Sequence, residues 1–240
     1  MNKMTIPMMK QIEDMVSTIP GWSPIDQLYT LFNMVYLNSD LQGDIVEIGS
    51  WCGRSTSVLG LAARMVGNAK IYCIDLFPKK NDWRQNEDGS YSFEVTIDKK
   101  RYGGYQEHTV WKEPFERDIA PLYERYNSVL DIFMESMRQN NLLDIVKPFR
   151  GDSEMLKMVV PNGFKCRLAF VDGDHSYEAV CKDIRNVEPF LIKGGWICFD
   201  DAFSSYDGVN SAITDLVINN PAYELCQQMT RKLFIAHKKK

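Results

Sequence analysis

The sequence predicts an α/β protein with a doubly wound, mostly parallel sheet that helices cover on both faces. From Asp44 onward, short β-type runs alternate with helical patterns, which is typical of such a sheet. The chain has 240 residues, and its 45% hydrophobic and 25% charged residues are those of an ordinary globular protein. We therefore expect a single domain over residues 1–240.

Residues 1–40 precede the alternating pattern and predict two N-terminal helices. Four apolar residues recur at helical spacing in the first: Met8, Ile12, Met15 and Ile19. Pro20 ends that helix, and the second opens with Ser23 as the expected N-cap and Pro24 as the first helical residue. The methionine-rich stripe suits either core packing or a contact between two copies of the chain.

The alternating part supplies strands and helices in turn. Strands are expected at 44–50, 70–77, 146–153 (with a turn), 166–174 and 194–202, and a final β pair at 223–228 and 233–238. Helices are expected at 54–66, 127–140, 176–191 and 207–219. In the helix over 54–66, we expect Val58, Ala62 and Met65 to share the face that packs on the sheet.

An insertion over residues 78–126 interrupts this rhythm. It carries charges of both signs and many aromatic residues: Trp83, Tyr91, Phe93, Tyr102, Tyr105 and Trp111. A connection of this length inside a domain is usually a lid, a binding segment or a partner surface. It follows the second strand, at the edge where the other strand ends gather. A lid over a site, a surface hairpin and a contact within a homo-oligomer all remain open.

Bulk properties exclude several classes of function. The net charge of −4 offers no basic footprint for nucleic acid. No stretch approaches the roughly 18 apolar residues of a membrane span, and the N-terminus does not have the pattern of a secretory signal. Six cysteines are scattered without a CxxC pair, which favours a reducing, cytoplasmic setting and cysteines that pack in the core.

The stretch "VEIGSWCGRST" forms the first strand-to-helix turn. Gly49 and Gly53 allow a tight turn and a close approach of a ligand to the backbone, and Asp75 ends the second strand, where such folds hold a ribose. The spacing is not the GxGxxG of dinucleotide sites, and no P-loop lysine follows. Glu47 would repel a phosphate. These features favour a ligand with adenosine at one end and positive charge at the other.

Acidic residues follow two further strands of the predicted sheet. Asp172 ends the strand "CRLAFVDGD", while Asp200 and Asp201 end the strand "GGWICFDDA". Because parallel strands direct their carboxyl ends to one edge, these carboxylates should meet in space. Three hard oxygen ligands suit Mg²⁺ or a similar divalent ion, and zinc is disfavoured because a second histidine or a thiolate is lacking. Alternatively, the acids cap helices, with Asp201 near the helix at Asp207.

Together these motifs resemble a known family. "VEIGSWCGRST" followed by "IDLF" resembles the first two motifs of class I S-adenosylmethionine-dependent methyltransferases. "VDGDHSYEAVCKDI" with "LIKGGWICFDD" resembles more narrowly the metal-dependent sugar O-methyltransferases of the macrocin and mycinamicin type, and the related cephalosporin hydroxylase-like proteins. The resemblance covers roughly residues 44–238 without the insertion. It implies a Rossmann-like sheet of seven strands whose last strand is antiparallel.

The resemblance also implies roles for individual residues. Gly49, Ser50 and Gly53 would lie against the methionine part of S-adenosylmethionine, Glu47 near its ammonium group, and Asp75 on the ribose. The turn from Gly151 to Ser153 would touch the adenine, so Asp152 and Ser153 join the expected cofactor site, as does Asp172. The metal would be bound by Asp172, Asp200 and Asp201. A cap on the strand end or the next helix is the alternative for Glu47, Asp152 and Ser153.

The implied reaction is methyl transfer to a hydroxyl group of a sugar, glycoside or other polar small molecule. His175 is the expected base, because histidine titrates near neutrality, and Asp174 is the second candidate. His175 could instead cap the following helix, His108 is a weaker candidate for the base, and His237 is expected to be structural. The resemblance also leaves open an iron-dependent hydroxylase-like enzyme, although two histidines for a facial triad are lacking. Alternatively, the chain is a non-catalytic, cofactor-binding scaffold, and an NAD-dependent dehydrogenase is disfavoured by the glycine spacing.

Overall fold

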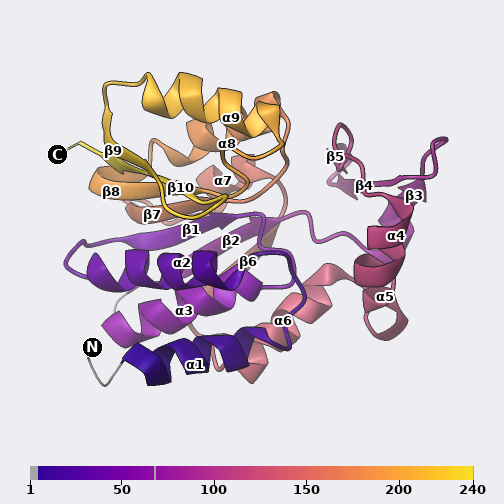
Figure 1. The fold of residues 1–240 in the computed structure, drawn as a ribbon, viewed down its shortest axis with the longest axis horizontal. Helices are drawn as coiled ribbons and strands as arrows, with labels where there is room; N and C mark the ends of the chain where they lie inside the picture. The colour runs from indigo at the N-terminus through magenta and orange to yellow at the C-terminus, as the bar shows by residue number, and fades with distance from the viewer. Residues whose placement is uncertain (1–4, 68, 240) are drawn as a thin grey trace.

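The computed structural model describes residues 5–67 and 69–239, with side chains from residue 7 onward. Its centre is a seven-stranded sheet in the order β6-β2-β1-β7-β8-β10-β9 (Figure 1). The strands are β1 (Asp44–Ile48), β2 (Ile71–Asp75), β6 (Val146–Arg150), β7 (Cys166–Val171), β8 (Leu191–Phe199), β9 (Tyr223–Gln228) and β10 (Phe234–Lys238).

Strand directions confirm the expected fold class. Strands β6, β2, β1, β7 and β8 pair in parallel, whereas β10 pairs antiparallel with both β8 and β9. The last strand of the chain therefore runs against the others, as the family resemblance implied. Ile48 pairs with Val171 and Val171 with Phe199, so three neighbouring strands end at the same level. The residues that follow these strands gather at one edge of the sheet.

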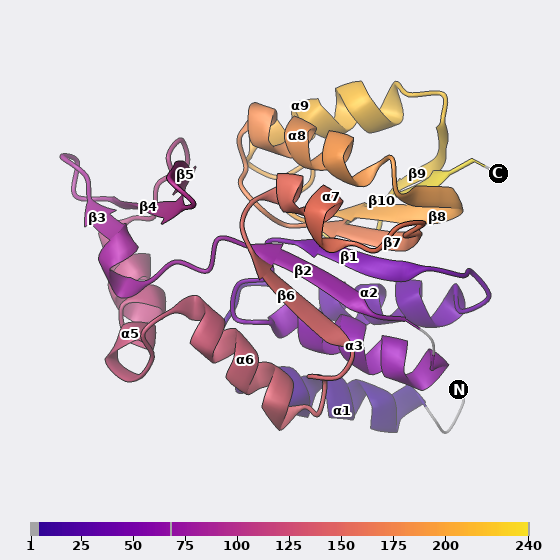
Figure 2. The ribbon, with the colours of Figure 1, turned by 180° about the vertical axis from the view of Figure 1, so that it is seen from behind.

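Helices cover both faces of the sheet (Figures 1 and 2). One face carries α1 (Thr5–Val16), α2 (Ile25–Leu37), α3 (Arg54–Val66) and α6 (Val129–Gln139). The other carries α7 (Leu156–Val159), α8 (Tyr177–Val187) and α9 (Asp207–Ile213), with the short turns η3 (Ser153–Met155) and η4 (Thr214–Ile218) adjoining α7 and α9. This is the two-layer cover that alternating strands and helices predict.

Alternating side chains divide the core into two clusters. Along β7, Leu168 and Phe170 pack towards α1, α2, α3 and α6, while Ala169 and Val171 pack towards α8 and α9. The period of two in a strand sends successive side chains to opposite faces, so a strand covered on both sides becomes apolar throughout. Because both faces are buried, the register of β7 is fixed, and so is the position of Asp172 relative to the ends of the neighbouring strands.

Several expected boundaries differ from the structure. Pro24, rather than Ser23, occupies the N-cap position of α2, where its extended backbone (φ −71°, ψ 159°) precedes the first helical turn. Met65 is 42% exposed, and α3 instead packs through a nearly continuous run from Ser55 to Ala63, because it is covered by both α2 and the sheet. Strand β8 begins at Leu191, earlier than expected, and its pairing with β7 shifts register between Leu191 and Trp196, the stretch that contains Gly194 and Gly195.

The insertion is a small folded unit rather than a loop. Strands β3 (Trp83–Gln85), β4 (Tyr91–Ile97) and β5 (Lys100–Gly104) form an antiparallel sheet in chain order, preceded by the turn η1 (Lys80–Asp82). Short helical segments follow: α4 (Lys112–Pro114), η2 (Phe115–Ile119) and α5 (Leu122–Arg125). Aromatic packing holds the two parts together, with the rings of Tyr91 and Phe115 stacked at 3.8 Å between centroids.

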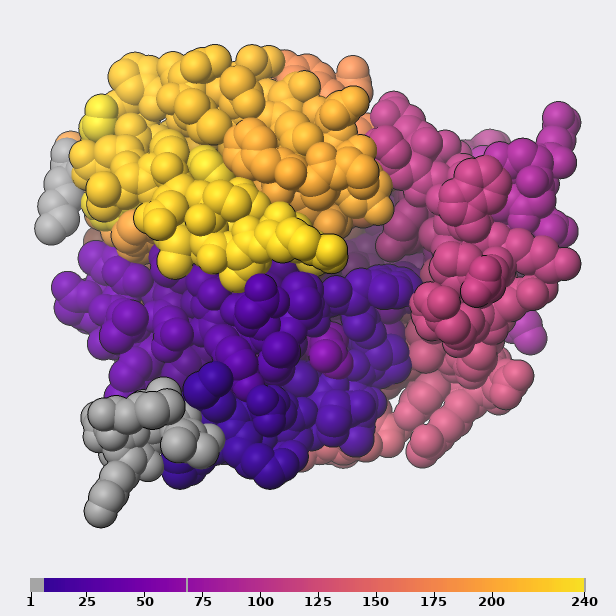
Figure 3. Space-filling view, viewed as in Figure 1, coloured from indigo at the N-terminus to yellow at the C-terminus, as the bar shows by residue number. Residues whose placement is uncertain are grey.

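The insertion projects from the end of β2 and forms one side of the molecule (Figures 1 and 3). It contacts several of the loops that follow the strands of the main sheet. The Trp83 ring meets the Trp51 ring edge-on at 6.5 Å, and Lys100 Nζ lies 2.7 Å from Glu154 Oε2. The hairpin β4–β5 thus reaches the turn that follows β6. Among the described residues, no helix is long and apolar enough to cross a membrane.

Candidate active site

Three carboxylates meet at the carboxyl ends of β7 and β8. One oxygen each from Asp172, Asp200 and Asp201 lies within 4.8 Å of the others. The parallel ladder produces this meeting, because Asp200 N donates to Val171 O at 3.0 Å and so continues the pairing past the ends of both strands. Asp200 is 5% exposed. Placing acidic groups this close costs free energy unless a positive charge accompanies them.

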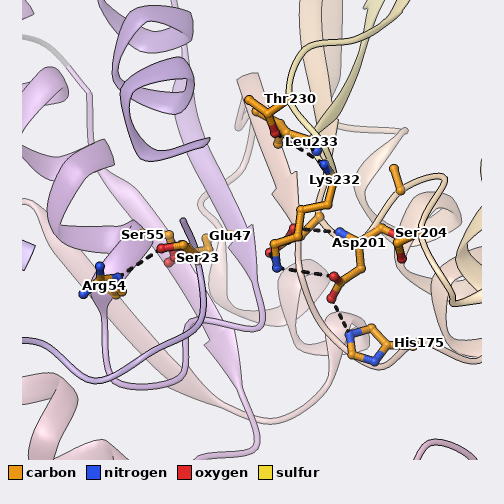
Figure 4. A network of polar contacts seen from close by, with 12 residues as sticks. Ser23, Glu47, Arg54, Ser55, His175, Asp201, Ser204, Thr230, Lys232 and Leu233 are labelled. Atoms are coloured by element: carbon orange, nitrogen blue, oxygen red, sulfur yellow. Dashed lines mark hydrogen bonds and ion pairs between the residues drawn. The ribbon is translucent and has the colours of Figure 1, made fainter. Parts of the chain in front are cut away.

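Lys232 brings a positive charge to this carboxylate cluster (Figure 4). Its Nζ lies 3.2 Å from Asp200 Oδ2 and 3.3 Å from Asp201 Oδ1. Lys232 belongs to the turn between β9 and β10, and its carbonyl accepts a 2.9 Å hydrogen bond from Ala202 N. The antiparallel pairing of β10 with β8 brings this turn next to the end of β8.

His175 contacts the carboxylate cluster from the loop after β7. Its Nε2 lies 3.1 Å from Asp201 Oδ2 (Figure 4). Its ring stacks on Tyr206 with centroids 4.0 Å apart. Because a carboxylate only accepts hydrogen bonds, Nε2 is the donor in the contact with Asp201, and Nδ1 is the ring nitrogen that remains for another partner. The N-cap of α8 is Ser176, not His175.

Charges within the cluster shift its pKa values in different directions. Burial, followed by repulsion from Asp200, raises the pKa of Asp172 well above its usual value. Burial also pushes the pKa of Asp201 upward, but the hydrogen bond to His175 and the charge of Lys232 outweigh it, so this pKa is lowered. Burial pulls the pKa of Lys232 down, whereas the carboxylates together raise it above its usual value.

Asp201 has a left-handed backbone with φ 52°. Aspartate tolerates this conformation better than most residues, but it still costs free energy, and such residues concentrate at functional sites. The conformation lets Asp201 N donate to Asp200 Oδ1 at 2.7 Å. The N-cap position of α9 is Tyr206, so the alternative in which Asp201 caps that helix is not what the structure contains.

Aromatic rings from the insertion surround His175. The centroid of Tyr105 lies 6.4 Å from that of His175, and His108 lies 6.3 Å from His175 and 5.0 Å from Tyr206. Burial, together with the nearby charge of Asp172, raises the pKa of the Tyr105 hydroxyl. The insertion therefore forms one wall of the site. His237 lies elsewhere on β10, with its Nδ1 3.0 Å from Glu224 Oε1, as expected for a structural residue.

The backbone conformation and the surroundings of the two glycines in the first loop disfavour any other residue. Gly49 has φ 84°, and a Cβ there would lie 1.9 Å from the carbonyl oxygen of Asp172. Gly53 has φ 88°, and its Cβ would lie 2.7 Å from Met137 Cε. A side chain at position 49 would clash with the backbone of β7's end, whereas at position 53 the left-handed backbone is the main reason for glycine, because the Met137 methyl group can move. The loop after β1 is thereby pressed against the end of β7, which brings the expected cofactor loop next to the carboxylate cluster.

Glu47 has the anchoring role that was the alternative to a ligand contact. It is 0% exposed, accepts a 2.7 Å hydrogen bond from Ser55 Oγ and is also bonded by the Thr56 hydroxyl (Figure 4). Burial raises its pKa, although these donors oppose the shift. Glu47 therefore fixes the start of α3 through these two hydroxyl groups. Ser50, 2% exposed, lies against Glu47 and Cys73.

Asp75 ties the end of β2 to the first loop. Its Oδ2 accepts from Trp51 N at 2.9 Å and its Oδ1 from Phe77 N at 2.6 Å. Burial raises its pKa against the effect of these backbone donors. An ionised carboxylate offers about four acceptor positions. The backbone donors leave part of this capacity unused, so the partly exposed Asp75 can still accept from a neighbouring hydroxyl group, which fits a ribose.

The turn after β6 makes contacts of a different kind. Asp152 is the N-cap of η3 and accepts from Glu154 N at 3.3 Å, and its other oxygen pairs with Lys182. Ser153 is 0% exposed and accepts a 3.0 Å hydrogen bond from Asn186 Nδ2. Both side chains thus have the capping and packing roles given as alternatives. Asp174 likewise accepts from Ser176 N at 2.9 Å, at the start of α8.

Comparison with known proteins identifies the family. A family model described as "Methyltransferase domain" matches residues 46–202, more than half of the chain. The chain belongs to this family. It is an S-adenosylmethionine-dependent methyltransferase. The match begins inside β1 and ends just past the carboxylate cluster, so it contains both the cofactor loop and the acidic residues.

Solved structures share the fold of this methyltransferase. The O-methyltransferase NovP is 18% identical, with a TM-score of 0.61 over 90% of this chain and 81% of NovP. TomG from Streptomyces achromogenes, an O-methyltransferase solved with S-adenosylmethionine, is 11% identical, with a TM-score of 0.57 over 100% and 92%. CalS11, described as a TDP-rhamnose 3'-O-methyltransferase, is 13% identical, with a TM-score of 0.54 over 99% and 95%.

Sequence reasoning missed two residues of the site. Lys232 lies in a polar turn and belongs to no motif, so only the pairing of β10 with β8 could have indicated it. Tyr206 is seven positions after Phe199, the end of β8, and a residue so close to the acidic pair could have been considered. Tyr105 was one of several aromatic residues in the insertion, and its sequence neighbours give no sign that it approaches Asp172.

Proposed function

We propose that this methyltransferase transfers the methyl group of S-adenosylmethionine to a hydroxyl oxygen of a sugar, a glycoside or another polar small molecule, with a divalent ion such as Mg²⁺ at Asp172, Asp200 and Asp201. One observation carries the proposal: a histidine ring contacts a member of the carboxylate cluster at 3.1 Å. A base beside hard oxygen ligands is the arrangement that deprotonating an alcohol requires.

The donor set fits a hard divalent ion. The three carboxylates come close enough to share one ion, and Mg²⁺ prefers oxygen ligands while retaining several waters. When bound, the ion would supply a Lewis acid that lowers the pKa of a hydroxyl group. S-adenosylmethionine would supply an electrophilic methyl group. The side chains of the protein would accept the proton and bind the cofactor and the acceptor.

His175 is the proposed base, and its proton would be taken at Nδ1. Asp201 contacts Nε2 and orients the ring so that Nδ1 is free to accept a proton, in the same way that a buried aspartate orients a catalytic histidine. Tyr206 restricts the ring by stacking against it. Asp174, the second candidate, already accepts a hydrogen bond from Ser176 N at the start of α8, so one of its oxygens is engaged by the backbone.

The cofactor half of the site is proposed at the ends of β1 and β2. Asp75 would accept the ribose hydroxyls, and the backbone of residues 49–53 would line the methionine part. Glu47 and Ser50 would act on this site indirectly, by fixing the loop and the start of α3. For Asp152 and Ser153 we propose that the backbone of the turn, rather than their side chains, meets the adenine, since both side chains already have partners.

The insertion is proposed as the acceptor wall of the site. Tyr105, His108 and Tyr206 present ring faces and edges around His175, and aromatic rings with polar tips suit the mixed apolar and hydroxylated faces of a sugar. CalS11 and NovP, which share the fold, are described as O-methyltransferases, the former acting on TDP-rhamnose. These descriptions support a polar, hydroxylated acceptor for this chain.

Two alternatives are less well supported. An iron-dependent hydroxylase needs ligands such as two histidines and a carboxylate, whereas the described cluster consists of three aspartates with His175 bonded to one of them. A non-catalytic scaffold would not need carboxylates to be assembled beside a histidine, at a cost in folding free energy.

The test is methyl transfer from labelled S-adenosylmethionine to a panel of nucleotide sugars and glycosides, with and without EDTA. We expect transfer to at least one hydroxylated acceptor, abolished by EDTA and restored by Mg²⁺. The Asp200→Asn variant should lose this activity and still bind S-adenosylhomocysteine in calorimetry. Activity that persists in EDTA and in the variant would refute the metal role, and NAD binding more tightly than S-adenosylhomocysteine would refute the cofactor.

A further inference from the structure

Every oxygen of Asp200 and Asp201 already has a partner within the protein. Asp200 Oδ1 accepts from Asp201 N at 2.7 Å, and Asp200 Oδ2 lies 3.2 Å from Lys232 Nζ. Asp201 Oδ1 lies 3.3 Å from the same Nζ, and Asp201 Oδ2 lies 3.1 Å from His175 Nε2. The ammonium group of Lys232 therefore bridges the two residues that are proposed to hold a divalent ion.

The bridge is built into the fold rather than made by a free surface lysine. The side chain of Lys232 is 14% exposed and that of Asp200 is 3% exposed. The turn that carries Lys232 is fixed at several points. Gln228 Nε2 donates to Ala202 O at 3.1 Å, Ala202 N donates to Lys232 O at 2.9 Å, and Leu233 N donates to Thr230 Oγ1 at 3.1 Å (Figure 4).

We propose that Lys232 is the resident counter-ion of the carboxylate cluster and that a divalent ion binds there against its charge. The proposal rests on the metal site of the proposed function. Lys232 is a positioning residue: it holds the ligand carboxylates together when no ion is bound. Mg²⁺ binds oxygen at about 2.1 Å. An ion at that distance from the oxygens that Lys232 now contacts would force the ammonium group to withdraw.

Two consequences follow from electrostatics. Without a divalent ion, Lys232 offsets part of the repulsion among Asp172, Asp200 and Asp201, so its removal destabilises the metal-free protein. With the ion present, the ammonium group is a like charge at short range, and its removal strengthens ion binding. A structural lysine unrelated to the ion would produce the first effect without the second, so metal affinity separates the two roles.

The experiment compares Lys232→Met with Arg231→Met as the matched control. Arg231 is the preceding residue and is exposed, so its variant loses the same charge from the same turn. Calorimetry with Mg²⁺ or Mn²⁺ should give a dissociation constant about tenfold or more lower for Lys232→Met than for the wild type. In EDTA its Tm should fall by about 5–10 °C, and the divalent ion should restore most of this loss. Arg231→Met should match the wild type in both measurements.

Lys232→Arg keeps the charge and provides a variant that should remain folded, with an ion affinity close to that of the wild type. If Lys232→Met does not fold in EDTA, folding that is recovered by Mg²⁺ supports the proposal. Equal or weaker ion affinity in Lys232→Met overturns it and leaves the proposed function intact. If neither protein binds a divalent ion, the metal role in the proposed function fails, and the proposal for Lys232 fails with it.

Discussion

Asp183 lies on α8 beneath the turns that follow β6 and β7, and its ionisation should govern how stability depends on pH. It is 7% exposed, and a Cβ on Gly173 would lie 3.2 Å from its Oδ2. Burial raises its pKa from 3.8 to about 7, while the hydrogen bond from Ser153 and the charge of Lys182 act in the opposite direction. Replacing it by asparagine keeps the shape and removes the titration.

The sign of the effect follows from proton counting. Between the unfolded pKa of 3.8 and the folded pKa of about 7, the folded protein holds a proton on Asp183 that the unfolded chain has lost. Stability therefore falls as pH rises through this window. The folded and unfolded pKa values of Asp183 differ by about three units, and each unit corresponds to about 1.4 kcal/mol. The free energy of unfolding therefore falls by about 4 kcal/mol, and the loss is complete above pH 7.

Urea unfolding of the wild type and Asp183→Asn between pH 4 and pH 8 measures this loss. The free energy of unfolding of the wild type, relative to the variant, should decrease by about 4 kcal/mol over that range. Asp98→Asn is the control, because Asp98 is exposed in the turn between β4 and β5. Parallel pH profiles for wild type and Asp183→Asn would refute the reasoning, since they would mean that Asp183 titrates alike in both states.

Three further changes test other parts of the account. His175→Ala should lower kcat by about 10²–10⁴-fold with an unchanged dissociation constant for S-adenosylhomocysteine, and a rate within threefold of the wild type would exclude His175 as the base. Glu47→Ala leaves the Ser55 and Thr56 hydroxyls unpaired and should cost about 2–4 kcal/mol in urea unfolding; a loss below about 1 kcal/mol would contradict its anchoring role. Tyr105→Ala should raise the acceptor KM about five- to tenfold and spare cofactor binding, and an unaltered KM would remove the insertion from the acceptor site.

The meeting of Asp172 with Asp200 could be predicted from sequence because it depends on a local pattern and one rule. Buried parallel strands are nearly continuous apolar runs, and their ends share an edge. Once β7 and β8 were recognised, the acids that follow them had to converge. The antiparallel direction of the last strand was implied by the family resemblance and not by the alternation of strands and helices.

Contacts between distant segments could not be predicted in this way. Glu47 looked like a ligand residue because its strand end faces the cofactor loop, but the first turn of α3 supplies two hydroxyl donors that occupy it. Lys232 joins the carboxylates only because the last hairpin folds back beside β8. The insertion is folded by ring packing such as that of Trp83 with Phe93, at 4.9 Å, which has no period in the sequence.

Diffraction from crystals grown with S-adenosylhomocysteine and Mn²⁺ would test the central claim most directly, because the anomalous signal locates the ion independently. We expect a manganese peak bonded by Asp172, Asp200 and Asp201, with the ribose of the nucleotide on Asp75 and its sulfur in the same crevice. A nucleotide bound away from the ends of β1 and β2, or manganese bound at other residues while these carboxylates keep only Lys232, would contradict that claim.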